Sequence, residues 1–185
     1  MVLALQQRPE RLREYRRRNG AFGRVHFGKV GALSWDGCLA GHRAIWTQAE
    51  RDTLVFEDDV VLTPDWVMCL QAVKPPADWD LLYLGGQHVD REGESSAGLA
   101  RCQATVRTHA YVVRHSSIAR LLELTEGVSE HLDTALSARM RLGQVVAYAM
   151  CPWVAGQVAG LSSITGRQEP ERWWTETCRT VAPNG

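Results

Sequence analysis

Apolar segments of strand length alternate along this chain with segments of helix length, and no internal repeat occurs. Strands are predicted at residues 1–5, 53–56, 80–84, 110–113 and 145–150, with a further extended stretch at 60–62. Helices are predicted at residues 9–18, 38–51, 65–73, 116–124 and 132–142. In residues 38–51 the apolar positions follow the 3.6-residue period of an amphipathic helix. This alternation is typical of an α/β domain in which helices cover a sheet.

Turn and capping residues place several of these boundaries. Pro9 suits the first turn of a helix, and Thr63 followed by Pro64 predicts an N-cap and first helical position. The pair Gly85-Gly86 is expected to close the strand at 80–84. Residues 87–103 are rich in Gly, Ser and charged side chains and are too long for an ordinary connection. A substrate lid and a disordered excursion both fit this segment.

Composition supports one ordinary globular domain. The chain has 185 residues, of which 45% are hydrophobic and 23% are charged. A single domain over residues 1–185 is expected, with its core in 1–165 and a polar C-terminal arm in 166–185. No apolar run approaches the ~20 residues that cross a bilayer, so no transmembrane helix is expected. The apolar first residues precede arginines, the reverse of a signal peptide.

The cysteines and the net charge bear on location and partners. The chain has 5 cysteines and no CxxC pair, which predicts reduced packing thiols and a cytoplasmic protein. The formal net charge is +0, so no overall field attracts nucleic acid or an anionic membrane. Arginines are concentrated at residues 8–18, and this helix is expected to face nucleotide, nucleic acid or only water.

The strongest local signal is the acidic triplet Glu57-Asp58-Asp59, which directly follows the apolar strand 53–56. Open α/β sheets bind ligands at the carboxyl ends of their strands, and hard divalent cations need clustered carboxylates. An acidic turn exposed to water is the alternative reading. The apolar residues on both sides favour partial burial, which is costly for three carboxylates without a cation.

Other candidates follow from position. Arg8 and Arg11 come after the first strand at a helix start, where guanidinium groups and backbone N–H groups suit phosphate, although a solvated basic face is the alternative. Asp133 lies near the start of a helix and is a candidate general base, with helix capping as the competing role. His42 lies on the apolar stripe and is expected to be a hydrogen-bonded core residue, with a role in the site as the alternative. His109 is expected to complete a metal shell or to be a core residue.

Several motifs in order along the chain resemble glycosyltransferase family 25, the group of bacterial lipooligosaccharide and procollagen galactosyltransferases. They are GCLAGH at 37–42, LVFEDDVVL at 54–62, DWDLLYLGG at 78–86, THAYVV at 108–113, HLD at 131–133, and Pro152, Gln157 and SSI at 162–164. The opening strand and its RPER step at 8–11 match as well. The resemblance therefore covers most of the chain.

This resemblance implies a GT-A type domain, a nucleotide-binding sandwich with a mixed central sheet flanked by helices. In such domains an acidic motif holds Mn²⁺ or Mg²⁺ against the diphosphate of a nucleotide sugar. Asp59 and Glu57 have the spacing of such a motif and are expected to be metal ligands together with His109, while Asp133 or Asp58 is expected to be the catalytic carboxylate. The implied donor-binding residues are Arg8, Arg11, Glu57, Asp58, Thr108 and Gln157.

The activity expected from the resemblance is metal-dependent transfer of a hexose from a UDP-sugar to an acceptor hydroxyl, with inversion. The acceptor is open between a glycan or lipooligosaccharide, a hydroxylated protein and a hydroxymethylated base in viral DNA, with nucleic acid the less favoured partner. A nucleotidyltransferase is an alternative that also uses carboxylates and a divalent ion, although no GxxxxGK[ST] loop occurs. A non-catalytic nucleotide-sugar binding protein is a further alternative.

Overall fold

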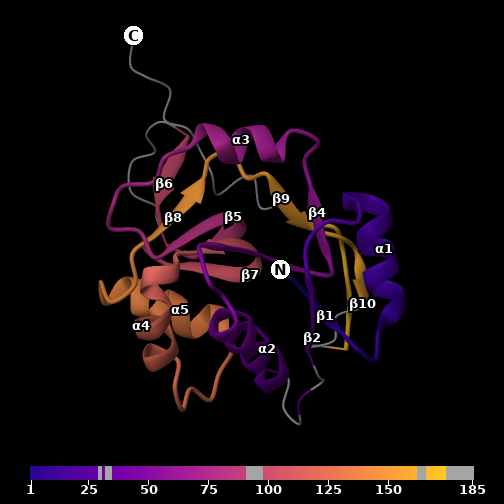
Figure 1. Ribbon diagram of the computed structural model, residues 1–185, viewed down its shortest axis with the longest axis horizontal. Coiled ribbons are helices and arrows are strands. Elements are labelled where there is room, and N and C mark those ends of the chain that lie inside the picture. Colours follow the sequence, from indigo (N-terminus) through magenta and orange to yellow (C-terminus); the bar gives the residue numbers. More distant parts are fainter. Residues whose placement is uncertain (29–30, 32–34, 91–97, 162–165, 174–185) are drawn as a thin grey trace.

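The computed structural model describes residues 1–28, 31, 35–90, 98–161 and 166–173, and it contains a seven-stranded mixed sheet (Figure 1). The strand order across the sheet is β2-β1-β3-β7-β5-β8-β6. The strands are β1 (Val2–Leu5), β2 (Val25–Gly28), β3 (Thr53–Glu57), β5 (Leu81–His88), β6 (Leu99–Arg101), β7 (Thr105–Val113) and β8 (Ala147–Met150). Two small antiparallel pairs accompany it, namely β4 (Val60–Leu62) with β9 (Ala155–Gln157) and β10 (Gly160–Leu161) with β11 (Gln168–Glu169).

Strand direction brings five carboxyl ends to one edge of the sheet. β1 is parallel to β2 and β3, and β5 is parallel to β8. β7 is antiparallel to both β3 and β5, so β3 and β5 run in the same direction. The residues that follow β3 therefore meet the beginning of β7 and the ends of β1 and β2 at this edge, which we call the carboxyl edge.

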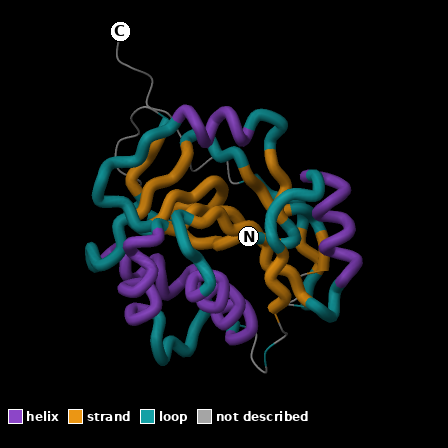
Figure 2. The backbone as a smooth tube through the Cα atoms, viewed as in Figure 1, coloured by secondary structure: helices purple, strands orange, loops and turns teal. Residues whose placement is uncertain are grey.

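Alternating side chains along the strands form two cores, one on each face of the sheet. On one face Val55, Tyr83 and Tyr111 pack against α2 (Asp36–Thr47), α4 (Ile118–Leu124) and α5 (Leu132–Arg141). On the other face Phe56 and Leu84 pack in a core with residues of α1 (Pro9–Asn19) and α3 (Trp66–Ala72). Figure 2 shows the strands between these two groups of helices.

The predicted fold class, an α/β sandwich with a mixed central sheet flanked by helices, is confirmed. Several boundaries differ. The helix predicted at 38–51 occupies Asp36–Thr47, and the helix predicted from Pro64 begins at Trp66 with Asp65 as its N-cap. β7 begins five positions before the predicted residue 110. The extended stretch 60–62 pairs with β9 in a sheet of its own.

The glycine pair does not close its strand. β5 continues through Gly85 and Gly86 to His88, and β6 occupies Leu99–Arg101, so the predicted loop at 87–103 is shorter than expected. The central part of that loop, residues 91–97, lies outside the described residues, as do residues 162–164 of the matched motif. A glycine is needed at position 85 because a Cβ there would lie 2.1 Å from the carbonyl oxygen of Ala155.

We expect Gly85→Ala to destabilise the fold by roughly 1–3 kcal/mol or more, because the backbone of β9 must move to admit the methyl group. Urea unfolding measures the change. Gly160→Ala is the matched control, since a Cβ at position 160 meets nothing within 4 Å. Equal stability of the two variants would show that β9 does not approach β5 this closely.

Two further expectations concern the membrane and the cysteines. Among the described residues, no helix has both the length and the apolar character needed to cross a membrane. Cys38, Cys69 and Cys102 are thiols, but Cys151 is disulfide-bonded. The prediction that every cysteine is reduced is therefore wrong at Cys151, because spacing along the chain carries no information on which distant cysteines approach each other.

Candidate active site

The acidic triplet lies at the carboxyl edge, where β3 ends and the chain turns into β4. Glu57 is the last residue of β3, and Asp58 and Asp59 form the turn before β4. The three carboxylates face different partners, which come from α1, α2, β7 and β9. The triplet is thus in contact with four other elements of the fold, and it is not an acidic turn exposed to water.

Glu57 is held by residues from two elements. Its Oε1 lies 3.3 Å from Nε2 of His42 on α2 and accepts a hydrogen bond of 3.0 Å from Oγ1 of Thr108 on β7. Burial alone would raise the pKa of Glu57, but the hydrogen bond and charge of His42, followed by His109 and Thr108, lower it to about 2. Glu57 is therefore a fixed carboxylate.

His42 is itself fixed by the core. Its Nδ1 lies 2.9 Å from the hydroxyl of Tyr111, and Trp46 donates its indole N–H to the same hydroxyl oxygen at 2.8 Å. All three side chains are fully or almost fully buried. These bonds hold the imidazole with Nε2 directed at Glu57, so the predicted core position of His42 and its contact with the site coexist.

Asp58 joins the site to the first strand and helix. Its Oδ1 forms an ion pair of 2.7 Å with Arg11 on α1, and its Oδ2 accepts the backbone N–H of Leu5 at 3.4 Å. Asp58 is only 5% exposed. Burial raises its pKa to about 7, with Arg11 opposing and Asp59 adding to the shift.

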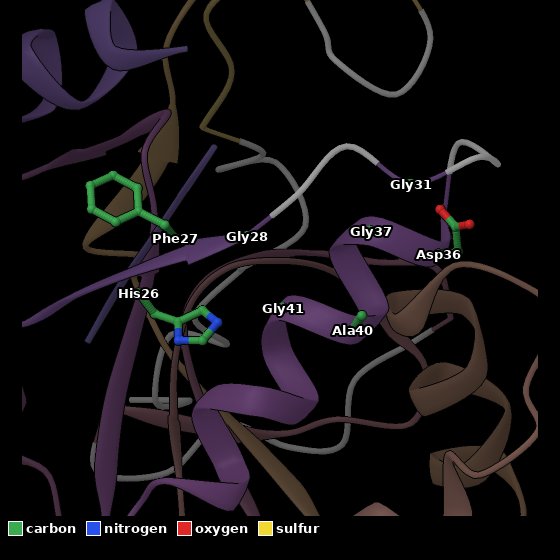
Figure 3. Close-up of a pocket in the computed structure, with 8 residues that line it drawn as sticks. All are labelled: His26, Phe27, Gly28, Gly31, Asp36, Gly37, Ala40 and Gly41. Atoms are coloured by element: carbon green, nitrogen blue, oxygen red, sulfur yellow. The ribbon is translucent and has the colours of Figure 1, made fainter. Parts of the chain in front are cut away.

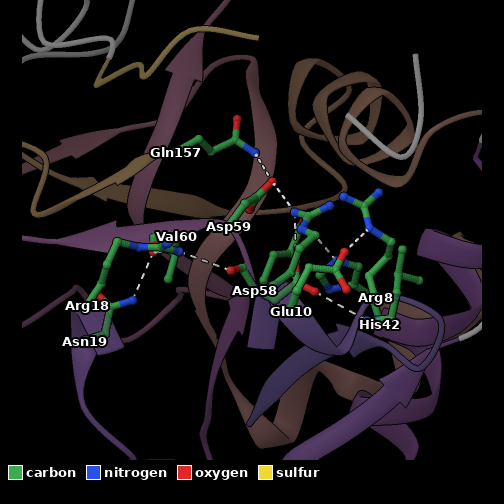
Figure 4. Close-up of polar contacts among 12 residues, drawn as sticks. Arg8, Glu10, Arg18, Asn19, His42, Asp58, Asp59, Val60 and Gln157 are labelled. Carbon is green, nitrogen blue, oxygen red and sulfur yellow. Dashed lines mark hydrogen bonds and ion pairs between the residues drawn. The ribbon is translucent and has the colours of Figure 1, made fainter. Parts of the chain in front are cut away.

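Asp59 points toward β9 and α1 (Figure 4). Its Oδ2 lies 3.0 Å from Arg11 and accepts a hydrogen bond of 3.3 Å from Nε2 of Gln157. Its Oδ1 is buried and has no hydrogen-bond partner among the described residues. Burial, followed by the charge of Glu57, raises the pKa of Asp59.

The charges of the triplet are incompletely balanced by protein groups. Arg11 contacts two of the three carboxylates, and both of those have a raised pKa. A raised carboxyl pKa means that the ionised form is disfavoured where it stands. An additional positive charge at Asp58 and Asp59 would therefore stabilise the site.

We expect the raised pKa of Asp58 to make Asp58→Asn more stable than the wild type at pH 8. The pKa in the folded chain is about 7, against an ordinary aspartate pKa of 3.8. Ionisation therefore costs stability as the pH rises through 7, and the cost disappears once the pH falls toward 4. The advantage of the variant should shrink from pH 8 to pH 5.

The measurement is the free energy of unfolding of both proteins, without divalent ions, across that pH range. Only the difference between the two is used, because burial lowers the pKa of His88 and His109 to about 4 and makes both chains lose stability in acid. A difference independent of pH would contradict the raised pKa of Asp58.

Asp133 lies at the second position of α5, and His131 is the N-cap residue. Its Oδ2 accepts the backbone N–H of Arg107 at 3.0 Å, and its Oδ1 accepts that of Thr134 at 2.8 Å. Arg107 has a φ of 76°, the single positive φ among the described non-glycine residues. Asp133 therefore holds a strained position within β7, a role that neither the base nor the cap interpretation predicted.

Arg107 and Thr108 connect the carboxylates across the site. Arg107 binds Asp133 through its N–H, and the next residue, Thr108, binds Glu57 through its hydroxyl. Burial, followed by the charges of Glu57, Asp133 and Asp59, raises the pKa of the Cys38 thiol. The Cys38 thiol and the carboxylates of Glu57, Asp59 and Asp133 therefore lie near one another at the carboxyl edge.

Arg8 and His109 are the remaining predicted site residues. Arg8 is the N-cap residue of α1 and its side chain pairs with Glu10. Among the described residues, one group of three possible metal-ligand atoms lies within 4.8 Å of one another. His109, which is fully buried on β7, does not belong to this triad. That triad is Cys38, His42 and Glu57.

Sequence reasoning missed Cys38, Tyr111 and Arg107 as members of the site. The i, i+4 spacing of Cys38 and His42 on a predicted helix could have indicated the first. Tyr111 resembles any buried strand residue, and a positive φ at an arginine leaves no signal in sequence.

A pocket of about 390 Å³ lies between the end of β2 and the first turns of α2 (Figure 3). Its lining combines His26, Phe27 and Gly28 of β2 with Gly31, Asp36, Gly37, Ala40 and Gly41. Phe27 is 53% exposed. The His26 imidazole points toward α2 and the Phe27 ring points away from it (Figure 3), so the pocket offers an imidazole and bare backbone near the carboxyl end of β2.

No protein-family model matches the chain, and no curated protein matches it. Solved structures with similarity include an inositol-1-phosphate CTP transferase from T. maritima, at 12% identity and a TM-score of 0.46, covering 80% of this chain and 64% of that chain. A UDP-glucose pyrophosphorylase complexed with UDP-glucose matches at 11% identity and a TM-score of 0.47, covering 80% and 72%. This similarity concerns the arrangement of sheet and helices alone.

Proposed function

We propose that this chain is a metal-dependent glycosyltransferase that takes a hexose from a nucleotide sugar, with UDP as the carrier. The observation that carries the proposal is the acidic triplet at the carboxyl edge, where Asp59 and Glu57 are held in place by residues of four different elements. The family 25 motifs at these positions support it. The proposed acceptor classes are a glycan, a hydroxylated protein and a modified DNA base.

The residues at Asp59 fit a hard divalent cation such as Mn²⁺ or Mg²⁺. Asp59 Oδ1 is buried without a hydrogen-bond partner among the described residues, and the protein supplies one guanidinium to two carboxylates. Asp59 would hold the ion, with Glu57 or Asp58 beside it. A bound divalent ion stabilises the negative charge that develops on a diphosphate leaving group.

The chain's own residues supply the other requirements. Arg11 can turn a guanidinium N–H toward a phosphate when a cation replaces it at Asp59. The pocket between β2 and α2 has a volume within the range of small-molecule sites and would take the nucleoside. Gln157 holds Asp59 in position through its amide. Arg8 and Thr108, at the same carboxyl edge, are proposed to contact the nucleotide sugar as well.

Asp133 is the proposed general base. Each of its oxygens accepts one backbone N–H, and a carboxylate oxygen has a second lone pair. Asp133 would take the proton of the acceptor hydroxyl as that oxygen attacks the anomeric carbon and the bond to the diphosphate breaks. Asp58 is the second candidate, but it is 5% exposed and is paired with Arg11.

The test is a thermal-shift screen of nucleotide sugars with and without Mn²⁺, followed by product analysis. A ligand that binds only the folded chain stabilises it by about 2.7 kcal/mol at 100 times its Kd. We expect a UDP-sugar to raise Tm only when Mn²⁺ is present, and the released product to be UDP. If no nucleotide sugar raises the Tm in the presence of Mn²⁺, or if no UDP is released, the proposal is wrong.

The product also separates the alternatives. A nucleotidyltransferase would join a nucleoside triphosphate to a sugar phosphate and release pyrophosphate. A binding protein without activity would show the thermal shift but no release of UDP from its donor.

A further inference from the structure

A second group of metal-binding atoms lies beside the acidic triplet and has a different chemistry. Cys38 Sγ, His42 Nε2 or Nδ1 and a Glu57 oxygen all lie within 4.8 Å of one another. Cys38 and His42 are four residues apart on α2 and therefore project from the same face of the helix. Glu57 reaches them from the end of β3. This is a sulfur, nitrogen and oxygen set rather than an all-oxygen one.

We propose that Cys38, His42 and Glu57 form a binding site for a zinc ion, separate in ligand chemistry from the hard-ion site at Asp59. Zinc is bound by cysteine sulfur, histidine nitrogen and carboxylate oxygen, and sites with three protein ligands keep the fourth position open. Mn²⁺ and Mg²⁺ prefer oxygen ligands and do not select this set.

The observed spacing fits tetrahedral zinc. Zn–N and Zn–O bonds of about 2.0–2.2 Å at a tetrahedral angle place the two ligand atoms roughly 3.3–3.5 Å apart. His42 Nε2 and Glu57 Oε1 lie 3.3 Å apart. Only the sulfur then needs to approach, by rotation of a side chain that belongs to a partly exposed residue.

The ligands also have the outer partners that metal sites require. A metal-bound histidine usually donates its other ring N–H to a fixed acceptor, and here Nδ1 lies 2.9 Å from the hydroxyl oxygen of Tyr111. Glu57 is oriented by Thr108 through a bond of 3.0 Å. Zinc bound through Nε2 would thus meet a histidine and a carboxylate that are already oriented.

Charge balance favours the same ion. A thiolate at Cys38, a carboxylate at Glu57 and a neutral imidazole carry two negative charges, which a divalent cation cancels. Binding zinc removes the thiol proton to solvent, since a coordinating thiol is deprotonated by the metal. The zinc ion and its three ligands together carry no net charge, which suits a site where His42 is fully buried.

The experiment uses the full chain freed of metal and titrated with Co²⁺ under anaerobic conditions. Coordination by sulfur produces a thiolate-to-cobalt absorption band, and Zn²⁺ should abolish the band because it binds such sites more tightly than Co²⁺. We expect the band in the wild type and its loss in Cys38→Ser. Cys69→Ser, which removes a thiol on α3, should keep it.

Two further variants keep the test decisive. Tyr111→Phe removes the partner of His42 Nδ1 and should weaken zinc binding about 10- to 100-fold while the band remains at saturation. Asp59→Asn should leave the band unchanged, so a failed donor site and a failed zinc site are distinguishable. No band in folded wild type, or the same band in Cys38→Ser, would overturn the proposal.

Discussion

Asp59→Asn is expected to remove the Mn²⁺-dependent part of donor binding while the fold stays intact. The variant keeps the shape of the side chain and one oxygen for Gln157 and Arg11, but it loses the charge that the buried Oδ1 offers to a cation. Loss of even an outer partner of a metal ligand costs 10–100-fold in affinity, so loss of a ligand should cost at least about 100-fold.

Isothermal calorimetry with UDP and Mn²⁺ measures this effect directly. Asp65→Asn is the control, because Asp65 is an exposed carboxylate at the start of α3. Thermal unfolding should show that Asp59→Asn is at least as stable as the wild type, since burial and Glu57 raise the pKa of Asp59 and its charge is a cost to the fold. Unchanged metal-dependent affinity would remove Asp59 from the site.

Asp133→Asn is expected to lower transfer to the acceptor by ~10² to 10⁴, the usual contribution of a positioned general base. Donor and metal affinity should stay near wild type. The amide oxygen of the variant can still accept the N–H of Arg107, and the bond to Thr134, on the exposed side of the carboxylate, can be replaced by water. The variant therefore separates the base from the structural role of Asp133.

Two comparisons make this result interpretable. Asp133→Ala removes both hydrogen bonds and should lower stability as well as transfer, because the strained backbone at Arg107 loses its support. Asp52→Asn alters an aspartate that also accepts a backbone N–H, that of His115 at 2.8 Å, at the opposite end of β3. Asp52→Asn should change neither the stability nor the rate of transfer to the acceptor. Near wild-type transfer by Asp133→Asn would exclude the base role and direct attention to Asp58.

The elements that could be predicted from sequence are those with strong apolar patterns. β3 and β8 lie in apolar runs, and α1 has proline at its start and glycine after its end. β2 and β6 were missed because each is short and carries one or more polar residues. Gly85 was misinterpreted as a turn residue, whereas the structure needs it for the close approach of Ala155.

The site divides in the same way. Its acidic triplet could be predicted because three carboxylates between apolar segments are rare and costly. The partners of those carboxylates could not, since Arg11, Thr108 and Gln157 are assigned to particular oxygens only by the sheet order. The strain at Arg107 depends on a contact with α5 that no local pattern predicts.

The position of β7 between β3 and β5 has a consequence for folding kinetics. β3 pairs with β7 from Thr53 opposite Val113 to Phe56 opposite Ala110, so this pairing closes a long loop. Contacts between distant segments form at a high entropic cost and slow the folding rate. Glu57 meets Thr108 only after β7 is inserted, and Asp59 meets Gln157 only after β9 docks. Substitutions of Thr108 and Gln157, which lose these contacts without removing a buried charge, should therefore accelerate unfolding and leave the refolding rate nearly unchanged, a division that stopped-flow measurements resolve.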